Sequence, residues 1–123
     1  GGRRRCGRCL QRRRAAFETE LTAVGLTGRR SLGGGSGGKG PGPETSILKS
    51  KGTEIQQRLQ ELAREAAGHY GAPFLRDLGH NANVGPDYAQ GVAGEYFNGR
   101  KTSIYGGSNE IQRNIIAKMV LGL

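Results

Sequence analysis

The chain has little of what usually builds a large core. Its 123 residues include no Trp, one Met and 6% aromatic residues, while 23 residues are Gly and the hydrophobic content is 34%. Large apolar side chains supply most of the free energy gained by burial. We therefore expect one small domain of modest stability and exclude a chain of several domains.

Long apolar runs are also missing. No stretch approaches the roughly 18 apolar residues that a membrane-spanning helix needs. The Arg-rich start lacks the apolar segment of a secretory signal, and its Gly and Cys content does not suit an amphipathic transit peptide. The sequence therefore predicts a cytoplasmic protein without a membrane segment.

Cysteine is scarce, and its placement argues against a metal centre. Cys6 and Cys9 form a lone Cys-x-x-Cys without the second pair that a structural zinc site would need. His69 and His80 lie far along the chain at a spacing unlike that of zinc ligands. We expect incidental cysteines and no metal.

Positive charge is concentrated at the amino end. Residues 1–51 hold 12 Lys and Arg against 3 Asp and Glu, whereas residues 52–123 hold 7 of each kind. The runs Arg3–Arg5 and Arg12–Arg14 are suited to phosphate contacts, so non-specific nucleic-acid binding is the alternative function. No interleaved aromatics or recognisable module accompany them.

The chain divides by composition into three segments. Residues 1–16 read as a disordered Arg/Gly-rich tail. Residues 17–43 contain a degenerate helix, Phe17–Leu32, followed by the Gly-rich linker Gly33–Pro43. Residues 44–123 form the helical domain.

Periodic apolar residues predict the helices of that domain. Residues 44–67 form an amphipathic helix with a possible kink or break at Gly52, ended by a left-handed Gly68. Residues 69–87 are loop-like, and residues 88–98 form a short helix. The last helix begins after an N-cap at Ser108, with Glu110 in its first turn. Its buried stripe consists of Ile111, Ile115, Ile116, Met119 and Val120.

The stretch "IYGGSNEIQRNIIAK", residues 104–118, carries the most specific pattern. Paired Gly ahead of a capped helix start allows a ligand to approach the backbone without meeting a Cβ. The same pattern also suits a plain tight turn. Physical reasoning leaves these two interpretations open.

The wording of two segments adds a family resemblance. "YFNGRKTSIYGGSNEIQRNIIAKMVLGL" resembles the carboxyl-terminal end of bacterial acyl-CoA dehydrogenases, and "SILKSKGTEIQQRLQELAREAAG" resembles the helical segment upstream of it. The resemblance covers roughly residues 40–123. It implies an all-α fold, a partial helical bundle of the carboxyl-terminal domain, to which the disordered basic tail is attached.

That resemblance also implies a chemistry. The family uses FAD to oxidise acyl-CoA to 2,3-enoyl-CoA in fatty acid metabolism, by removing an α proton and passing the β hydride to the flavin. Electrons then leave to an electron-transfer flavoprotein. The complete enzymes are homo-oligomers whose carboxyl-terminal bundles build the subunit interface.

The resemblance also assigns site residues, at the positions of this sequence that match the family motif. Ser108, Asn109 and Glu110 match FAD contacts, and Glu65 and Gly68 match a stretch that reaches the FAD of a neighbouring subunit. Tyr105, Gly106 and Gly107 match the wall beside the thioester.

The sequence departs from the family at the catalytic base. Gly106 stands where many members carry the catalytic Glu, so no catalytic residue is assigned in this chain. The family's helical amino-terminal domain and β-domain are also absent from the sequence, and residues 1–16 match nothing recognisable. We therefore expect a fragment of a longer enzyme that is inactive in isolation, with a truncated, frame-shifted or misassigned gene start.

Overall fold

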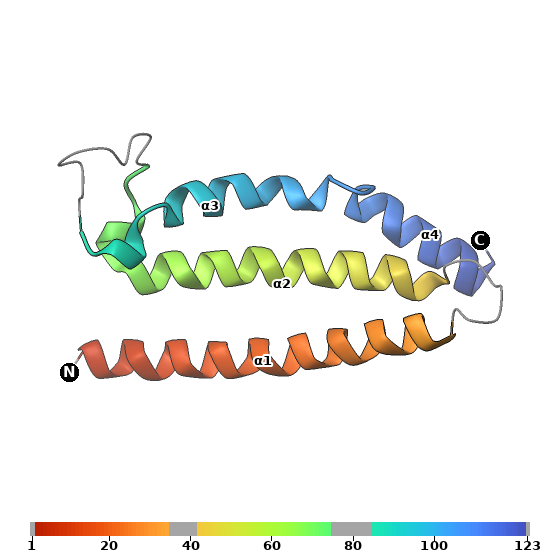
Figure 1. Cartoon of the computed structure of the whole chain (residues 1–123), viewed down its shortest axis with the longest axis horizontal. Helices are drawn as coiled ribbons and strands as arrows, with labels where there is room; N and C mark the ends of the chain where they lie inside the picture. The colour runs from red at the N-terminus through yellow and green to blue at the C-terminus, as the bar shows by residue number, and fades with distance from the viewer. Residues whose placement is uncertain (1, 35–41, 75–84, 123) are drawn as a thin grey trace. The chain divides into compact units, whose positions relative to one another are not determined.

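The computed structural model describes residues 2–34, 42–74 and 85–122. Its α-helices are α1 (Gly2–Gly34), α2 (Pro43–Ala67), α3 (Val92–Gly99) and α4 (Asn109–Leu121). Short 3-10 turns, η2 to η4, lie at Gly68–Gly71, Asp87–Ala89 and Arg100–Ser103 (Figure 1). The described residues contain no strand, and the predicted all-α fold is confirmed.

Helix α1 corrects the prediction of a disordered tail. Residues 2–16 are helical and continue without a break into the predicted weak helix. The physical reason is a Gly-free run from Arg8 to Val24, rich in the good helix formers Arg, Ala, Leu and Gln. Tertiary contacts hold it further, since Arg13 donates a hydrogen bond to Glu65 and Phe17 is only 6% exposed.

Helix α2 follows the sequence prediction closely. It runs without a break through Gly52, where a kink or break was expected, and ends at Ala67. Gly68 has a φ of 59°, the left-handed conformation predicted for it. Of the predicted linker Gly33–Pro43, residues 35–41 lie outside the described residues.

Helix α3 begins later than predicted. The short helix expected from residue 88 starts at Val92, after the turn η3. Gly91, with a φ of 79°, lies between them in the left-handed region and breaks the right-handed path. Of the predicted loop, residues 75–84 lie outside the described residues.

The chain forms two compact units. Unit 1 comprises Gly1–Arg14 and Gln56–Arg100, and unit 2 comprises Ala15–Ile55 and Lys101–Leu123. In unit 1 the guanidinium groups of Arg64 and Arg100 lie over the Tyr96 ring, 4.6 and 4.4 Å from its centroid. Arg100 also donates to the backbone carbonyl of Gln57, 2.9 Å away. Cation–π and hydrogen-bond contacts therefore fasten α3 to α2.

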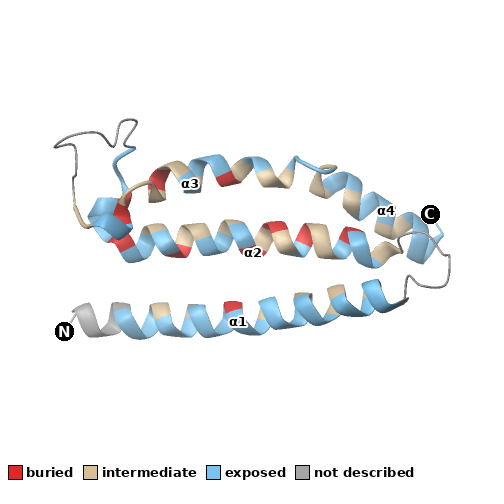
Figure 2. Ribbon diagram, viewed as in Figure 1, coloured by how far each residue is buried: buried red, intermediate tan, exposed pale blue. Residues whose placement is uncertain are grey.

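In unit 2 the first half of α2 contacts both α1 and α4. A Cβ added at Gly28 would lie 4.0 Å from Leu48, which records the close approach of α1. Glu54 and Arg113 pair across 3.8 Å on the α4 side. Few residues are buried (Figure 2), and three on α2 are polar. These are Ser46, Ser50 and Thr53.

Helix α4 does not bury the predicted apolar stripe. Ile111, Ile115 and Met119 are 53%, 36% and 54% exposed, and no residue of α4 is buried. The contacts of Asn109 and Arg113 to α2 lie on a different face of the helix from Ile111, Ile115 and Met119. Ile116 is half-buried, whereas Val120 is exposed.

Candidate functional site

The loop before α4 is shaped by two consecutive glycines in the left-handed region. Gly106 has a φ of 65° and Gly107 a φ of 86°. Such values are unfavourable for residues with a Cβ, so the turn needs glycine at both positions. A Cβ at Gly106 would meet nothing within 4 Å, which leaves its backbone accessible.

The start of α4 is capped by its own side chains. The Ser108 hydroxyl accepts a hydrogen bond from the Ile111 backbone N–H across 3.4 Å, so the predicted N-cap is confirmed. The Glu110 carboxylate accepts from its own backbone N–H and from the Ser108 hydroxyl, and these bonds lower the pKa of Glu110. The first-turn N–H groups of Glu110 and Ile111 are therefore already paired within the helix.

A lysine from α2 reaches across to the same loop. Lys49 Nζ donates to Asn109 Oδ1 at 2.8 Å and to the backbone carbonyl of Ser103 at 3.3 Å. Gln112 Nε2 donates to the Gly106 carbonyl at 3.0 Å, inside the turn. Loop 103–109 is thus held at both ends and near its middle.

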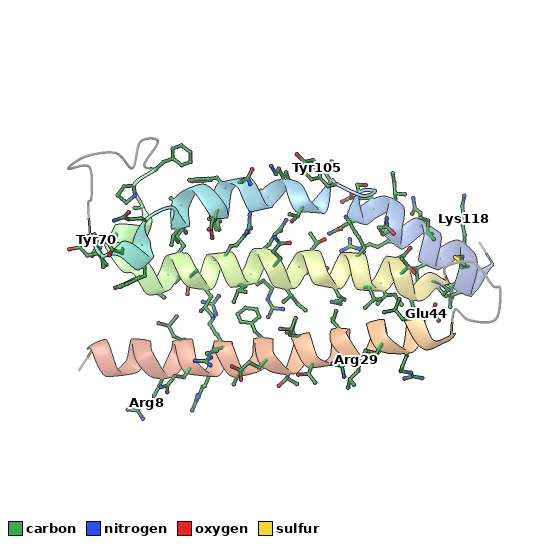
Figure 3. The ribbon with its side chains drawn as sticks, viewed as in Figure 1. Arg8, Arg29, Glu44, Tyr70, Tyr105 and Lys118 are labelled. Atoms are coloured by element: carbon green, nitrogen blue, oxygen red, sulfur yellow. The ribbon has the colours of Figure 1, made fainter. Side chains whose placement is uncertain are left out.

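The surface of the loop beside Gly106 is open and aromatic. Tyr105 is 60% exposed, and its ring lies on the side of the connection away from α2 (Figure 3). Lys101 Nζ lies 5.4 Å from the ring centroid, which steadies the ring by a cation–π contact. Tyr105 and Gly106 are exposed, and Gly107 is half-buried.

The predicted site residues fall into two groups. The structure brings together those from Tyr105 to Glu110 in unit 2. Glu65 and Gly68 lie in unit 1. Arg13 donates a hydrogen bond to the Glu65 carboxylate and lowers its pKa. Gly68 follows the last residue of α2, and a Cβ added to it would meet no atom within 4 Å.

The sequence pattern predicts no role in the site for Lys49, which stands among the polar residues between the apolar positions of the predicted helix 44–67. A signal was present, because Ser46, Ser50 and Thr53 recur at helical spacing and mark a face of close approach. Lys49 stands three residues after Ser46 and four before Thr53, on the edge of this face. Its partner on α4 has no such signal in the sequence.

Neither a metal-binding cluster nor a membrane-spanning helix occurs among residues 2–34, 42–74 and 85–122. This part of the chain contains no group of three or more His, Cys, Asp or Glu side chains that could hold a metal ion. It also contains no helix apolar enough over a sufficient length to cross a bilayer. The Cys9 thiol is free and exposed.

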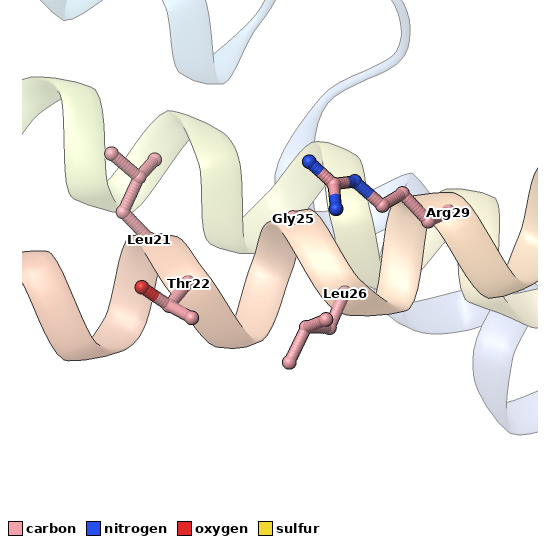
Figure 4. Close-up of a pocket in the computed structure, with 5 residues that line it drawn as sticks. All are labelled: Leu21, Thr22, Gly25, Leu26 and Arg29. Carbon is pink, nitrogen blue, oxygen red and sulfur yellow. The ribbon is translucent and has the colours of Figure 1, made fainter.

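A groove on α1 lies apart from the loop residues. It is lined by Leu21, Thr22, Gly25, Leu26 and Arg29, all from one helix (Figure 4). None of these is a predicted site residue, and only Arg29 among them is ionisable. The groove therefore adds no catalytic group to the candidate site.

Comparison with protein families identifies the chain. Residues 6–121 match the family described as acyl-CoA dehydrogenase, C-terminal domain. The match begins well before residue 40, where the resemblance in the sequence became recognisable, and includes most of α1. Comparison with curated proteins and comparison with solved structures each find no match. Because the family match covers nearly the whole chain, this protein belongs to the acyl-CoA dehydrogenase family and carries its carboxyl-terminal domain.

Proposed function

We propose that the chain supplies the flavin- and thioester-facing loop of a FAD-dependent enzyme that oxidises acyl-CoA to 2,3-enoyl-CoA. The observation that carries the proposal is loop 105–110. It combines two left-handed glycines and an exposed aromatic ring ahead of a capped helix with an anchored amide on the first residue of that helix. The family match supports the same reaction class.

The residues present fit a flavin edge in a specific way. FAD, when bound, accepts the β hydride of the substrate. Asn109 offers amide N–H donors, which suit the polar edge of the isoalloxazine ring. The backbone of Gly106 has no neighbouring atoms that a Cβ would meet, so a flat group can approach it. Ser108 and Glu110 contribute mainly by capping α4 and fixing the loop.

Proton abstraction requires a group outside position 106. An α-proton acceptor must lie within hydrogen-bond reach of the carbon that it serves. Gly106 has no side chain, and the exposed Glu110 carboxylate is engaged in capping. We propose that the base comes from outside loop 105–110 and that the isolated chain neither retains FAD through gel filtration nor turns over acyl-CoA.

The flavin proposal is tested by NMR with matched ligands. Isotope-labelled chain is titrated with FAD and, separately, with ADP, which carries the phosphates and adenine without the isoalloxazine ring. We expect weak, saturable amide shifts at residues 105–110 with FAD that ADP does not produce. Identical shifts with both ligands, or none at this loop, would refute flavin contact.

Turnover is tested separately with a panel of acyl-CoA thioesters. Purified chain, FAD and an artificial electron-accepting dye are combined, and dye bleaching is followed. We expect no bleaching above a control lacking protein. Bleaching that depends on both the chain and acyl-CoA would show that a base is present after all.

The exposed face of α4 supports a further part of the proposal, namely homo-oligomerisation. Ile111, Ile115 and Met119 expose apolar area on one face, which favours association in water. We expect sedimentation equilibrium to detect species larger than the monomer. Ile115→Ser should shift the distribution towards monomer, and an unchanged distribution would remove this face from the interface.

The alternative function, non-specific nucleic-acid binding, has one structural observation in its favour. Arg8 and Arg12 are exposed one helical turn apart on α1, and Arg8 projects away from α2 (Figure 3). Such a function predicts salt-sensitive retention on duplex DNA that Arg8→Gln with Arg12→Gln abolishes. Nucleic-acid binding would be favoured over the flavin proposal by two results together. The double variant would lose the retention on DNA that the wild-type chain shows, and the wild-type chain would show no FAD-specific shift in the titration above.

A further inference from the structure

We propose that Lys49 is a positioning residue that sets the path of loop 103–109 and turns the Asn109 amide so that its N–H2 group is presented to a ligand. The inference rests on the proposed flavin-facing role of this loop. It adds a residue of α2 to the site, whereas the family motif comprises only the loop and α4.

The first argument is the geometry of the two bonds. One ammonium group bonds Ser103 at 3.3 Å and Asn109 at 2.8 Å, and these residues bracket the turn that holds Tyr105, Gly106 and Gly107. Hydrogen bonds from a charged donor are about twice as strong as neutral ones. Lys49 therefore limits how far the two ends of the turn can separate.

The second argument concerns which half of the Asn109 amide faces a ligand. An ammonium group only donates, so the amide oxygen must face Lys49. The N–H2 group is then the part of Asn109 that remains for another partner. This orientation matches a ligand that offers carbonyl oxygen or ring nitrogen acceptors, as the isoalloxazine edge does.

The third argument is electrostatic. The amino end of a helix carries partial positive charge, so the helix dipole disfavours a lysine beside it. Lys49 nevertheless reaches the first residue of α4, where the Glu110 carboxylate lies close enough to feel its charge. The helix dipole therefore does not account for the placement of Lys49, whereas its two hydrogen bonds to Ser103 and Asn109 do.

The test compares two lysines on the same helix. Lys49→Met removes both bonds, whereas the control Lys51→Met removes an exposed lysine that pairs with Glu54. Hydrogen exchange at residues 103–109 should accelerate by about tenfold or more in Lys49→Met and stay unchanged in the control. The Asn109 side-chain amide resonances should move only in Lys49→Met, and Lys49→Arg should restore most of the protection.

A second variant separates orientation from loop order. Asn109→Asp keeps an acceptor for Lys49 but has no N–H2 group. We expect it to keep the loop protected while the FAD-specific amide shifts weaken by about tenfold in apparent affinity. Unchanged FAD-specific shifts in Asn109→Asp would overturn the assigned orientation.

The outcomes also separate this inference from the proposed function. If the wild-type chain shows no FAD-specific shifts, the flavin proposal fails, and the exchange and amide measurements still decide whether Lys49 orders the loop. Equal exchange rates in the Lys49→Met and Lys51→Met variants would overturn the positioning role even if FAD binds. If circular dichroism shows that Lys49→Met is unfolded, Asn109→Ala removes one of the two lysine bonds instead, and unchanged exchange at residues 103–109 in that variant would overturn the positioning role.

Discussion

Phe17 provides the sharpest test of whether the amino-terminal helix is part of the folded structure. It is 6% exposed and, with Ile55, makes up the buried apolar residues of unit 2 among those the structure describes. An aromatic side chain buries about 150–250 Å². At about 25 cal/mol per Å² this corresponds to about 4–6 kcal/mol, and measured Phe→Ala substitutions in cores cost about 3–5 kcal/mol.

We expect Phe17→Ala to lower the free energy of unfolding by about 3 kcal/mol, the low end of that range, because the surrounding core is small. Urea unfolding followed by circular dichroism measures the change. Leu21→Ala is the matched control on the same helix, since Leu21 is 60% exposed, and it should cost less than about 1 kcal/mol.

Two results would refute this reasoning. Equal losses for Phe17→Ala and Leu21→Ala would mean that Phe17 is not a packing anchor. A loss below about 1 kcal/mol for Phe17→Ala would mean that α1 contributes little to the fold. If Phe17→Ala does not fold, Phe17→Leu keeps the comparison measurable with an expected loss of about 1 kcal/mol.

Three further predictions concern the loop and the ion pair. Ser108→Ala removes the N-cap of α4 and should cost about 1 kcal/mol; hydrogen exchange at the Ile111 amide checks this, and unchanged exchange would contradict the cap. Gly106→Ala should lower the free energy of unfolding by about 1 kcal/mol through its positive φ alone. Gly107→Ala should lower it further, because Gln112 Nε2 would lie 2.6 Å from the new Cβ. Urea unfolding compares the two variants, and equal losses would count against the contact with Gln112. Because Arg13 lowers the pKa of Glu65, the pair contributes stability above the unfolded-state pKa of the carboxyl and loses it as pH falls through the lowered value. In a carbon NMR titration, Arg13→Gln should raise the Glu65 pKa towards its usual range, and an unchanged midpoint would exclude the pair in solution.

Features governed by neighbouring residues could be read from the sequence. The Ser108 cap bonds a backbone group three residues away, and Gly68 ends α2 through its own backbone freedom. The amphipathic period of residues 44–67 likewise gave the bounds of α2 within one residue. Local hydrogen bonds and local backbone preferences decide all of these, so no distant partner had to be known.

Features that depend on residues far apart in the chain could not be predicted from the sequence. The order of α1 depends on a Glu65 partner 52 residues from Arg13, which composition alone does not reveal. The role proposed for Lys49 depends on Asn109, 60 residues away, and the spacing of the apolar residues around the lysine does not reveal that partner. Periodicity also identified the apolar residues of α4 but not which face meets α2. The sequence by itself determined α2, the N-cap of α4 and the family motif, whereas only tertiary packing decided which faces are buried and which side chain orients the loop.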